Sequence, residues 1–340
     1  MPSLEFLLGG VMMVSLTFYA LLGGADYGGG VWDLLARGPR AIKQRELVAK
    51  AIGPIWEANH VWLILVVVVL FTAFPRAFAL ISTSLHVALL LMLFGIVLRG
   101  SAFIFRSHDP TYDHARWRWG RVFAIASLVP PVLLGVVAGA ISSATIRTPG
   151  DGVMLAYFFA WAAPFPFAVG LFALVLFALL AAVYLTLETD DAALQDDFRQ
   201  RAIACEVAAG LLALTLFLLA GQEAPAFRER LANSWWTWPL YLSSALLTLG
   251  TLGALWVRRF PWARACAAGQ VTLILWGWGL AQYPYMVRPE LTLHNSAAPQ
   301  ATLKALLWIL AAGVVLLFPS YWYLFYVFKG ETQSSPVKQG

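Results

Sequence analysis

The chain has 340 residues, of which 60% are hydrophobic and only 12% are charged. A soluble domain is about 25% charged, so this composition, with a mean hydropathy of +0.73, excludes a soluble protein and predicts an all-α polytopic membrane protein. The net charge of +5 comes without a basic face or a recognition motif, which argues against nucleic acid as a partner.

Nine apolar runs follow one another along the chain, and an α-helix needs about 20 apolar residues to cross the hydrocarbon. The N-terminus lacks a basic n-region and a small-residue cleavage site, so we expect the first run to be a retained span. Pro164 and Pro166 interrupt the overlong fifth run, which predicts a crossing nearer residues 166–187, after a tilted or re-entrant piece. The nine runs are residues 5–25, 53–74, 78–98, 120–142, 154–187, 203–221, 238–257, 265–285 and 303–328.

The connections between these runs differ in charge. Those after odd-numbered spans carry 17 of the 23 Lys and Arg residues, and the others carry 6. By the positive-inside rule, the N-terminus is predicted outside and the C-terminus in the cytoplasm. We expect residues 1–329 to form a single transmembrane domain of two four-helix groups plus one helix, followed by a polar cytoplasmic tail at 330–340. The two cysteines, Cys205 and Cys266, suggest no metal site or disulfide framework.

The first run ends near a carboxylate and a glycine triplet, in Gly23-Gly24-Ala25-Asp26-Tyr27-Gly28-Gly29-Gly30. Small residues let another helix or a cofactor approach the backbone closely. The structural alternative is a helix that ends here, with Gly28 as its C-cap and Asp26 solvated. The predicted topology puts Asp26 at the cytoplasmic end of span one.

The second run opens with Gly53-Pro54, which marks a helix start, so Glu57 is expected in the first turn, where the helix dipole favours an anion. His60 follows three residues later on the same face, and Trp56 flanks that surface. Polar groups near hydrocarbon are costly, which favours a functional site. The alternative is a boundary carboxylate among tryptophans of the interfacial aromatic belt.

Other polar residues are interpreted structurally. His86 lies within the third run and could ligate a heme, but a bond to a neighbouring helix is the favoured interpretation. Arg99 and Arg106 bracket the end of that run, and we expect them to anchor at the interface and attract anionic lipid. A solvated loop is expected for the acidic cluster of Glu188, Asp190, Asp191, Asp196 and Asp197, whose spacing matches no calcium loop.

At these residues the chain resembles subunit II of the cytochrome bd-type quinol oxidases. The two specific stretches are residues 24–32 and 52–63, the second reading Ile-Gly-Pro-Ile-Trp-Glu-Ala-Asn-His-Val-Trp-Leu. The motifs concentrate in the first 140 residues, whereas the number and length of the spans match throughout. Supporting matches are Leu98-Arg99-Gly100 with Phe105-Arg106, Pro130-Pro131 with Gly135, and Tyr283-Pro284-Tyr285.

The resemblance implies a complex in the bacterial cytoplasmic (inner) membrane. Subunit I of the family carries the low-spin heme b, the high-spin heme b and, in bd-type members, heme d, whereas subunit II carries none of them. Together the two subunits oxidise quinol and reduce dioxygen to water with protons taken from the cytoplasm. The expected partners are therefore a heme-bearing subunit I in a heterodimer, quinol and membrane lipids. Small accessory subunits and a structural quinone, which some members bind in subunit II, are left open.

The resemblance also assigns roles to residues. The family's carboxylate on span two falls on Glu57, where some members have aspartate, and its span-one aspartate falls on Asp26. Some members have glutamine at the position of His60, so no obligatory role is implied for the imidazole. We expect Glu57 to be the principal proton relay, Asp26 to lie at or near the entrance, and His60 to contribute hydrogen bonding. The neighbouring supports are Trp56, Asn59 and Trp62.

Two other functions are weighed against this one. A proton-coupled secondary transporter usually has broken helices in both halves and carboxylates near the midplane. Here the carboxylates lie near one face, and the second half lacks a matching pair. A purely structural membrane subunit is the third reading, and it differs from the first in predicting no loss of turnover when Glu57 is neutralised.

Overall fold

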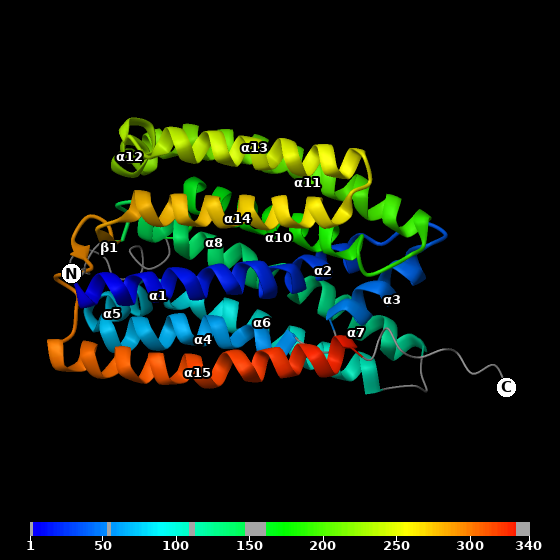
Figure 1. Ribbon diagram of the computed structural model, residues 1–340, viewed down its shortest axis with the longest axis horizontal. Helices are drawn as coiled ribbons and strands as arrows, with labels where there is room; N and C mark the ends of the chain where they lie inside the picture. The colour runs from blue at the N-terminus through cyan, green and yellow to red at the C-terminus, as the bar shows by residue number, and fades with distance from the viewer. Residues whose placement is uncertain (1–2, 53–55, 109–112, 147–160, 331–340) are drawn as a thin grey trace.

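The computed structural model describes residues 3–52, 56–108, 113–146 and 161–330. The described chain is almost entirely helical, and the helices lie side by side in an elongated bundle (Figure 1). The first half contains α1 (Leu4–Phe18), the π-helical turn η1 (Tyr19–Gly23), α2 (Gly24–Leu35), α3 (Ala41–Ile52), α4 (Trp56–Ala73), α5 (Pro75–Ser84), α6 (His86–His108), α7 (Asp113–Ala126) and α8 (Val129–Ser142). The second half contains α10 (Pro164–Leu185), α11 (Ala192–Glu223), α12 (Pro225–Asn233), α13 (Thr237–Trp256), α14 (Phe260–Gln282), the hairpin strands β1 (Tyr285–Val287) and β2 (Leu291–Thr292), and α15 (Gln300–Gly330).

The all-α polytopic prediction is confirmed. In the described ranges, 7 helices are long and apolar enough to cross a membrane, or 8 if α3 and α4 form one broken span. The 23-residue α14 runs beside α13 for most of its length (Figure 1). The predicted count of nine spans is therefore approximate.

The central helix is α10, which contacts α2 and α8 on one side and α11 and α14 on the other. Its residues from Leu176 to Val183 are all buried, so this stretch of α10 joins the two halves through the main apolar core. The last helix, α15, lies along α1 and α4 (Figure 1). The division into two four-helix groups plus one helix stays a prediction.

The prolines of the fifth run lie where α10 begins. The helix starts at Pro164, with proline in its first positions, and ends at Leu185. Proline is tolerated in the first turn because its missing N–H has no partner there. The crossing predicted near 166–187 is thus confirmed within a few residues, whereas most of the tilted or re-entrant piece expected before it lies outside the described residues.

The first span is longer than predicted. The helix continues past residue 25 to Leu35, so Gly28 is not a C-cap and Asp26 is not at a helix end. The reason is close packing, because a Cβ atom on Gly28 would lie 2.0 Å from the backbone oxygen of Phe177 on α10. A Cβ atom on Gly30 would likewise lie 2.2 Å from Cβ of Ser127. The glycines let α2 approach its neighbours instead of ending the helix.

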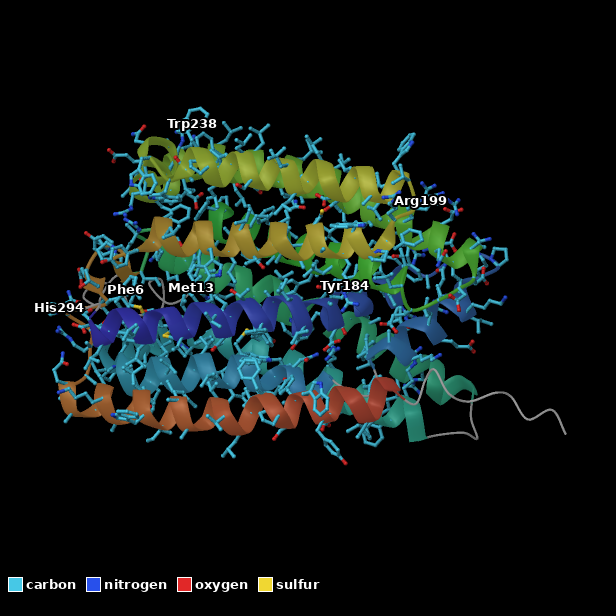
Figure 2. The ribbon with its side chains drawn as sticks, viewed as in Figure 1. Phe6, Met13, Tyr184, Arg199, Trp238 and His294 are labelled. Atoms are coloured by element: carbon cyan, nitrogen blue, oxygen red, sulfur yellow. The ribbon has the colours of Figure 1, made fainter. Side chains whose placement is uncertain are left out.

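The two ends of the bundle have different characters. The N-terminus, α5, α12 and β1 lie at one end, whereas α3 and α7 lie at the other (Figure 1). We call the second end the basic end, because the α2–α3 connection and α3 carry Arg37, Arg40, Lys43, Arg45 and Lys50. Figure 2 shows Arg199 towards this end of α11 and Trp238 near the opposite end of α13.

Exposed tryptophans mark both ends of α13. Trp235 and Trp238 are exposed where the helix begins, and Trp256 and Trp262 are exposed where it turns into α14. Twenty helical residues rise about 30 Å, which is the thickness of the hydrocarbon core. The tryptophans therefore form the two aromatic belts expected at the membrane interfaces.

Candidate functional site

The candidate site lies where the first turns of α4 meet the first turn of α2. The Asn59 side chain donates a hydrogen bond from Nδ2 to Oδ2 of Asp26, at 2.7 Å. Asn59 is buried and Asp26 is half-buried. Since α2 continues for nine residues beyond Asp26, the carboxylate lies about 13 Å along the helix from its basic end. A carboxylate at this depth is costly unless polar groups surround it.

Arg99 on α6 supplies such a group, and its guanidinium is almost fully buried, with 2% of the residue exposed. Its Nη2 donates to the backbone oxygen of Asp26 at 3.2 Å, and its Nε donates to Oγ of Ser127 at the same distance. The guanidinium also lies over the rings of Tyr27, at 4.7 Å, and Phe123, at 5.3 Å. The interpretation of Arg99 as an interface anchor is therefore wrong, because α6 continues beyond it and packs it inside the bundle.

His60 is half-buried beside two tyrosines. Its ring centroid lies 6.0 Å from the ring of Tyr19 and 6.0 Å from the ring of Tyr27. The hydroxyl of Tyr19 donates to that of Tyr27 at 3.4 Å, and Tyr27 is the residue over which Arg99 lies. His60 thus lies beside Tyr27, over which Arg99 packs, and Arg99 in turn binds the backbone oxygen of Asp26. The sequence pattern of α4 alone could not indicate this arrangement.

Glu57 lies in the first turn of α4, as expected, although Gly53-Pro54 are outside the described residues. Its side chain is exposed, and no described residue forms a hydrogen bond with its carboxylate. It stands at the head of an exposed apolar stripe on α4, because helical spacing places Val61, Ile64, Val68 and Phe71 on the same face. The structure therefore brings Asp26, Asn59 and His60 together but leaves Glu57 on the surface of this chain.

Trp62 and Tyr321 hold the first turns of α4 in place. Trp62 is buried and stacks on Phe18 of α1 with ring centroids 4.5 Å apart. The Tyr321 hydroxyl on α15 donates a hydrogen bond to the backbone oxygen of Ala58. These contacts fix the turn that carries Glu57 and Asn59, which agrees with a supporting role for Trp62. The side chain of Trp56 lies outside the described set.

A second polar pair near the basic end of α2 was missed from the sequence. The Arg106 Nη1 atom lies 3.0 Å from Oδ1 of Asp33, and Asp33 is only 3% exposed. Arg106, like Arg99, was expected to be an interface anchor, and its ion pair with α2 corrects that interpretation. The sequence did contain a signal for this ion pair, because Asp33 and Arg106 each follow an apolar run and carry opposite charges.

The remaining histidine candidates lie apart from this site. His86 is exposed at the start of α6, where its Nδ1 atom is 2.9 Å from the backbone oxygen of Thr83. His294 lies at the opposite end from α3, 3.0 Å from Oε1 of Glu5. Among the described residues, no group of three or more His, Cys, Asp or Glu side chains could hold a metal ion.

The acidic residues at 188–197 do not form a simple solvated loop. Asp191 caps α11 by accepting hydrogen bonds from the backbone of Ala193 and Leu194. Asp196 pairs with Arg199 and Arg258, and Asp197 pairs with Arg40. This segment therefore connects α11 to its neighbours at the basic end.

The site can hold and exchange protons inside a membrane span. It combines a half-buried carboxylate, an imidazole and two hydroxyls with a guanidinium whose charge offsets the cost of an anion at that depth. In a spanning helix such residues mark ion pathways and proton relays.

Comparison with known proteins places the chain in a family. Residues 4–328 match the family model described as cytochrome bd terminal oxidase subunit II. Subunit 2 of the cytochrome bd-I ubiquinol oxidase of Escherichia coli K12 is 25% identical over 94% of this chain and 93% of its own length. The putative cytochrome bd menaquinol oxidase subunit II of Bacillus subtilis 168 is 22% identical over 91% of each chain.

A solved structure shows the same fold. The bd oxidase from Geobacillus thermodenitrificans matches with a TM-score of 0.80 at 24% identity, and the match covers 96% of this chain and 99% of that one. Since the family model extends across almost the whole sequence, from the first helix to the last, the chain belongs to the cytochrome bd terminal oxidase subunit II family and is a subunit of a quinol-oxidising terminal oxidase.

Proposed function

We propose that this chain is the heme-free second subunit of a bd-type quinol oxidase. It pairs with a heme-bearing subunit I, which oxidises quinol and reduces dioxygen to water, and it delivers protons to that reaction from the cytoplasmic side. The observation that carries the proposal is the hydrogen bond between Asn59 and Asp26 within the spanning bundle. Hydrocarbon conducts no protons, so a reaction that consumes them needs titratable groups or water at such positions.

The positions of the histidines support a subunit without heme. An axial ligand needs an imidazole that faces a cavity large enough for a macrocycle. His86 lies on the outer surface of α6, and the ring of His60 packs beside Tyr19 and Tyr27. Neither imidazole is placed as such an axial ligand, which supports assigning the heme to the partner subunit.

Within this chain, protons enter on the side of Asp26 and leave through Glu57. Asp26 is the carboxylate held within the bundle, and Asn59 and Arg99 fix its position. Glu57 is on the same helix as Asn59 but is exposed at the head of the apolar stripe of α4. A partner that covers this stripe would enclose the Glu57 carboxylate and receive its proton. His60 orders the groups between them by hydrogen bonding.

The membrane placement follows from charge. The basic end carries the greater share of Lys and Arg residues, which assigns it to the cytoplasm. The N-terminus is then periplasmic and the C-terminus cytoplasmic, and residues 1–329 form one transmembrane domain with a polar tail. With this orientation Asp26 lies closer to the cytoplasmic end of its span than to the periplasmic end, and protons are taken from the cytoplasm.

The first experiment is an absorption spectrum. A complex purified through a tag on this chain should contain heme bands from subunit I, whereas the chain expressed alone should show no Soret band. Stoichiometric heme in the isolated chain would overturn the heme-free assignment and make His86 the first ligand to examine.

A second experiment separates proton delivery from a purely structural role. Neutralising Glu57 in a fully assembled complex should reduce turnover if the carboxylate relays protons, and should leave turnover unchanged if the chain only supports assembly. The transporter alternative predicts substrate uptake into cells by this chain without subunit I, which the proposed function does not.

A further inference from the structure

A polar pocket opens at the basic end, away from the Asp26 site. It lies where the connection between α2 and α3 meets the first turns of α11, and its volume is about 360 Å³. Its polar walls include Arg37, Arg40, Gln44, Asp197 and Arg201. Asp197, Arg201 and Ala204 follow one another at helical spacing, so they belong to one face of α11.

The charges in this pocket do not cancel. Arg40 forms a bidentate pair with Asp197, with Nη2–Oδ1 and Nε–Oδ2 distances of 2.6 and 2.8 Å. This bond raises the pKa of Arg40, and Gln44 Nε2 donates to the same carboxylate at 2.7 Å. Asp197 is therefore fully engaged. Arg37 and Arg201 form no ion pair with any described residue, which leaves an excess of positive charge.

Arg201 is held in place for binding an anion. Its Nη2 atom donates to Oε1 of Gln44 at 2.7 Å, and its guanidinium lies over the rings of Trp32, at 5.3 Å, and Phe198, at 5.0 Å. Nη1 is buried and has no acceptor among the residues that the structure describes. A guanidinium fixed in this way loses little conformational entropy when an anion binds beside it.

The same face of α11 continues as an exposed apolar stripe. Below Ala204 it carries Val207, Leu211, Leu214 and Leu218, all exposed and spaced by three or four residues. From Val207 to Leu218 the helix rises about 16 Å, roughly half the thickness of the hydrocarbon core and so the reach of one leaflet. The pocket thus lies at one end of an apolar surface that is about as long as the acyl chains of one lipid leaflet.

We propose that this pocket binds the phosphate-bearing headgroup of an anionic phospholipid, whose acyl chains lie along the apolar stripe of α11. Basic pockets between spanning helices bind such headgroups in other membrane proteins. Free phosphate has the same anionic chemistry, but it would make no use of the stripe. The site is separate from the proton-delivery residues, so its test does not depend on the proposed function.

The test uses the intact oxidase complex, stripped of lipid in detergent and then supplied with phosphatidylglycerol or phosphatidylcholine. Native mass spectrometry counts the lipids retained on each complex. The wild type should retain phosphatidylglycerol in preference to phosphatidylcholine. Arg37→Gln and Arg201→Gln should each lower that retention about fivefold, the effect of removing one basic residue near a lipid phosphate. Arg259→Gln, which removes an exposed arginine of the basic end outside the pocket, should leave it unchanged.

The neighbouring aspartates provide a test in the opposite direction. Asp197→Asn removes the negative charge of the pocket and should raise retention of phosphatidylglycerol, whereas Asp196→Asn, outside the pocket, should not. This pair keeps the proposal testable if Arg201→Gln fails to assemble, as judged by heme content. Equal retention of both lipids, or equal loss in Arg37→Gln and Arg259→Gln, would overturn the proposal. Inorganic phosphate that binds with the same arginine dependence while phosphatidylglycerol does not would overturn the lipid assignment.

Discussion

Asn59 of α4 and Asp26 of α2 form a side-chain hydrogen bond of 2.7 Å inside the helix bundle. The bond fixes a carboxylate about 13 Å along α2 from the basic end. A carboxylate at that depth in the membrane would be destabilising without a polar partner. Arg99 binds the backbone of the same aspartate and contributes the compensating charge. A polar group at this depth in a spanning bundle is a functional candidate, and the function that we propose for it is proton delivery.

Replacement of Asp26 by asparagine should slow the oxidase without removing heme. The amide keeps the size of the side chain and its contact with Asn59, but it cannot release a proton, so turnover should decrease several-fold. Glu206→Gln is the matched control, since Glu206 is a buried carboxyl that accepts a 3.0 Å hydrogen bond from Gln270 far from this site. The measurement is quinol oxidase activity per heme. Equal losses in the two variants would argue for a general packing effect.

Glu57→Gln should have the larger effect, because Glu57 is the group that we expect to hand the proton to the partner. We expect turnover to fall at least about tenfold, which corresponds to a barrier increase of about 1.4 kcal/mol. Glu57→Asp should retain most of the activity, and His60→Gln should cost least of all. Glu46→Gln, an exposed carboxylate of α3, controls for surface charge at the same end. Wild-type turnover in a fully assembled Glu57→Gln complex would place the proton route in the partner subunit.

The sequence was sufficient to find the polar residues of this site but not their partners. Asp26, Asn59 and His60 stand out because they interrupt apolar runs in a chain that must cross a membrane. That Asn59 reaches Asp26, and that Arg99 reaches its backbone, depends on which helices lie next to each other. Periodicity shows which face of a helix is polar, but it does not show which helix that face meets.

Helix ends were the other weak point of the sequence analysis. Glycine next to a polar residue is typical of a helix C-terminus, so the first span was predicted to end near Asp26. Gly28 instead lies against the backbone of Phe177, a contact between residues far apart in the sequence. Likewise, arginine near the end of an apolar run commonly extends to the interface, whereas Arg99 is buried. In both cases tertiary packing outweighed a reliable local rule.

Arg99→Gln should destabilise the complex as well as slow it. The change removes a charged hydrogen-bond donor to Ser127 and to the Asp26 backbone, together with the contacts over Tyr27 and Phe123. A cost on the order of 2 to 3 kcal/mol is expected for losing a buried, charged donor. The thermal midpoint of the detergent-solubilised complex should decrease, and Arg118→Gln, an exposed arginine of α7, should leave it unchanged. An unchanged midpoint in Arg99→Gln would show that the guanidinium contributes little to packing.

The predicted orientation can be measured with single cysteines. In a background without native cysteines, a cysteine at Arg40 should resist an impermeant thiol reagent in intact cells, and so should one at Thr332. A cysteine at Ala226, exposed on α12 at the opposite end from α3, should react. All three should react after the membrane is permeabilised, which controls for accessibility. Labelling at Arg40 but not at Ala226 in intact cells would invert the topology and place the entrance of the proton route on the other side.

The glycines of α2 give the clearest test of the packing itself. Gly28→Ala places a methyl group only 2.0 Å from the backbone oxygen of Phe177. A backbone atom cannot move aside as a flexible side chain can. We expect α2 and α10 to separate, which should reduce the yield of assembled complex and its thermal midpoint.

Gly10→Ala is the matched control, because a Cβ atom there meets nothing within 4 Å. Alanine is also favoured over glycine in a helix by about 1 kcal/mol, so Gly10→Ala should be neutral or slightly stabilising. If Gly28→Ala assembles as well as Gly10→Ala, the contact between these two helices is looser than described, and the position of Asp26 within it must be revised.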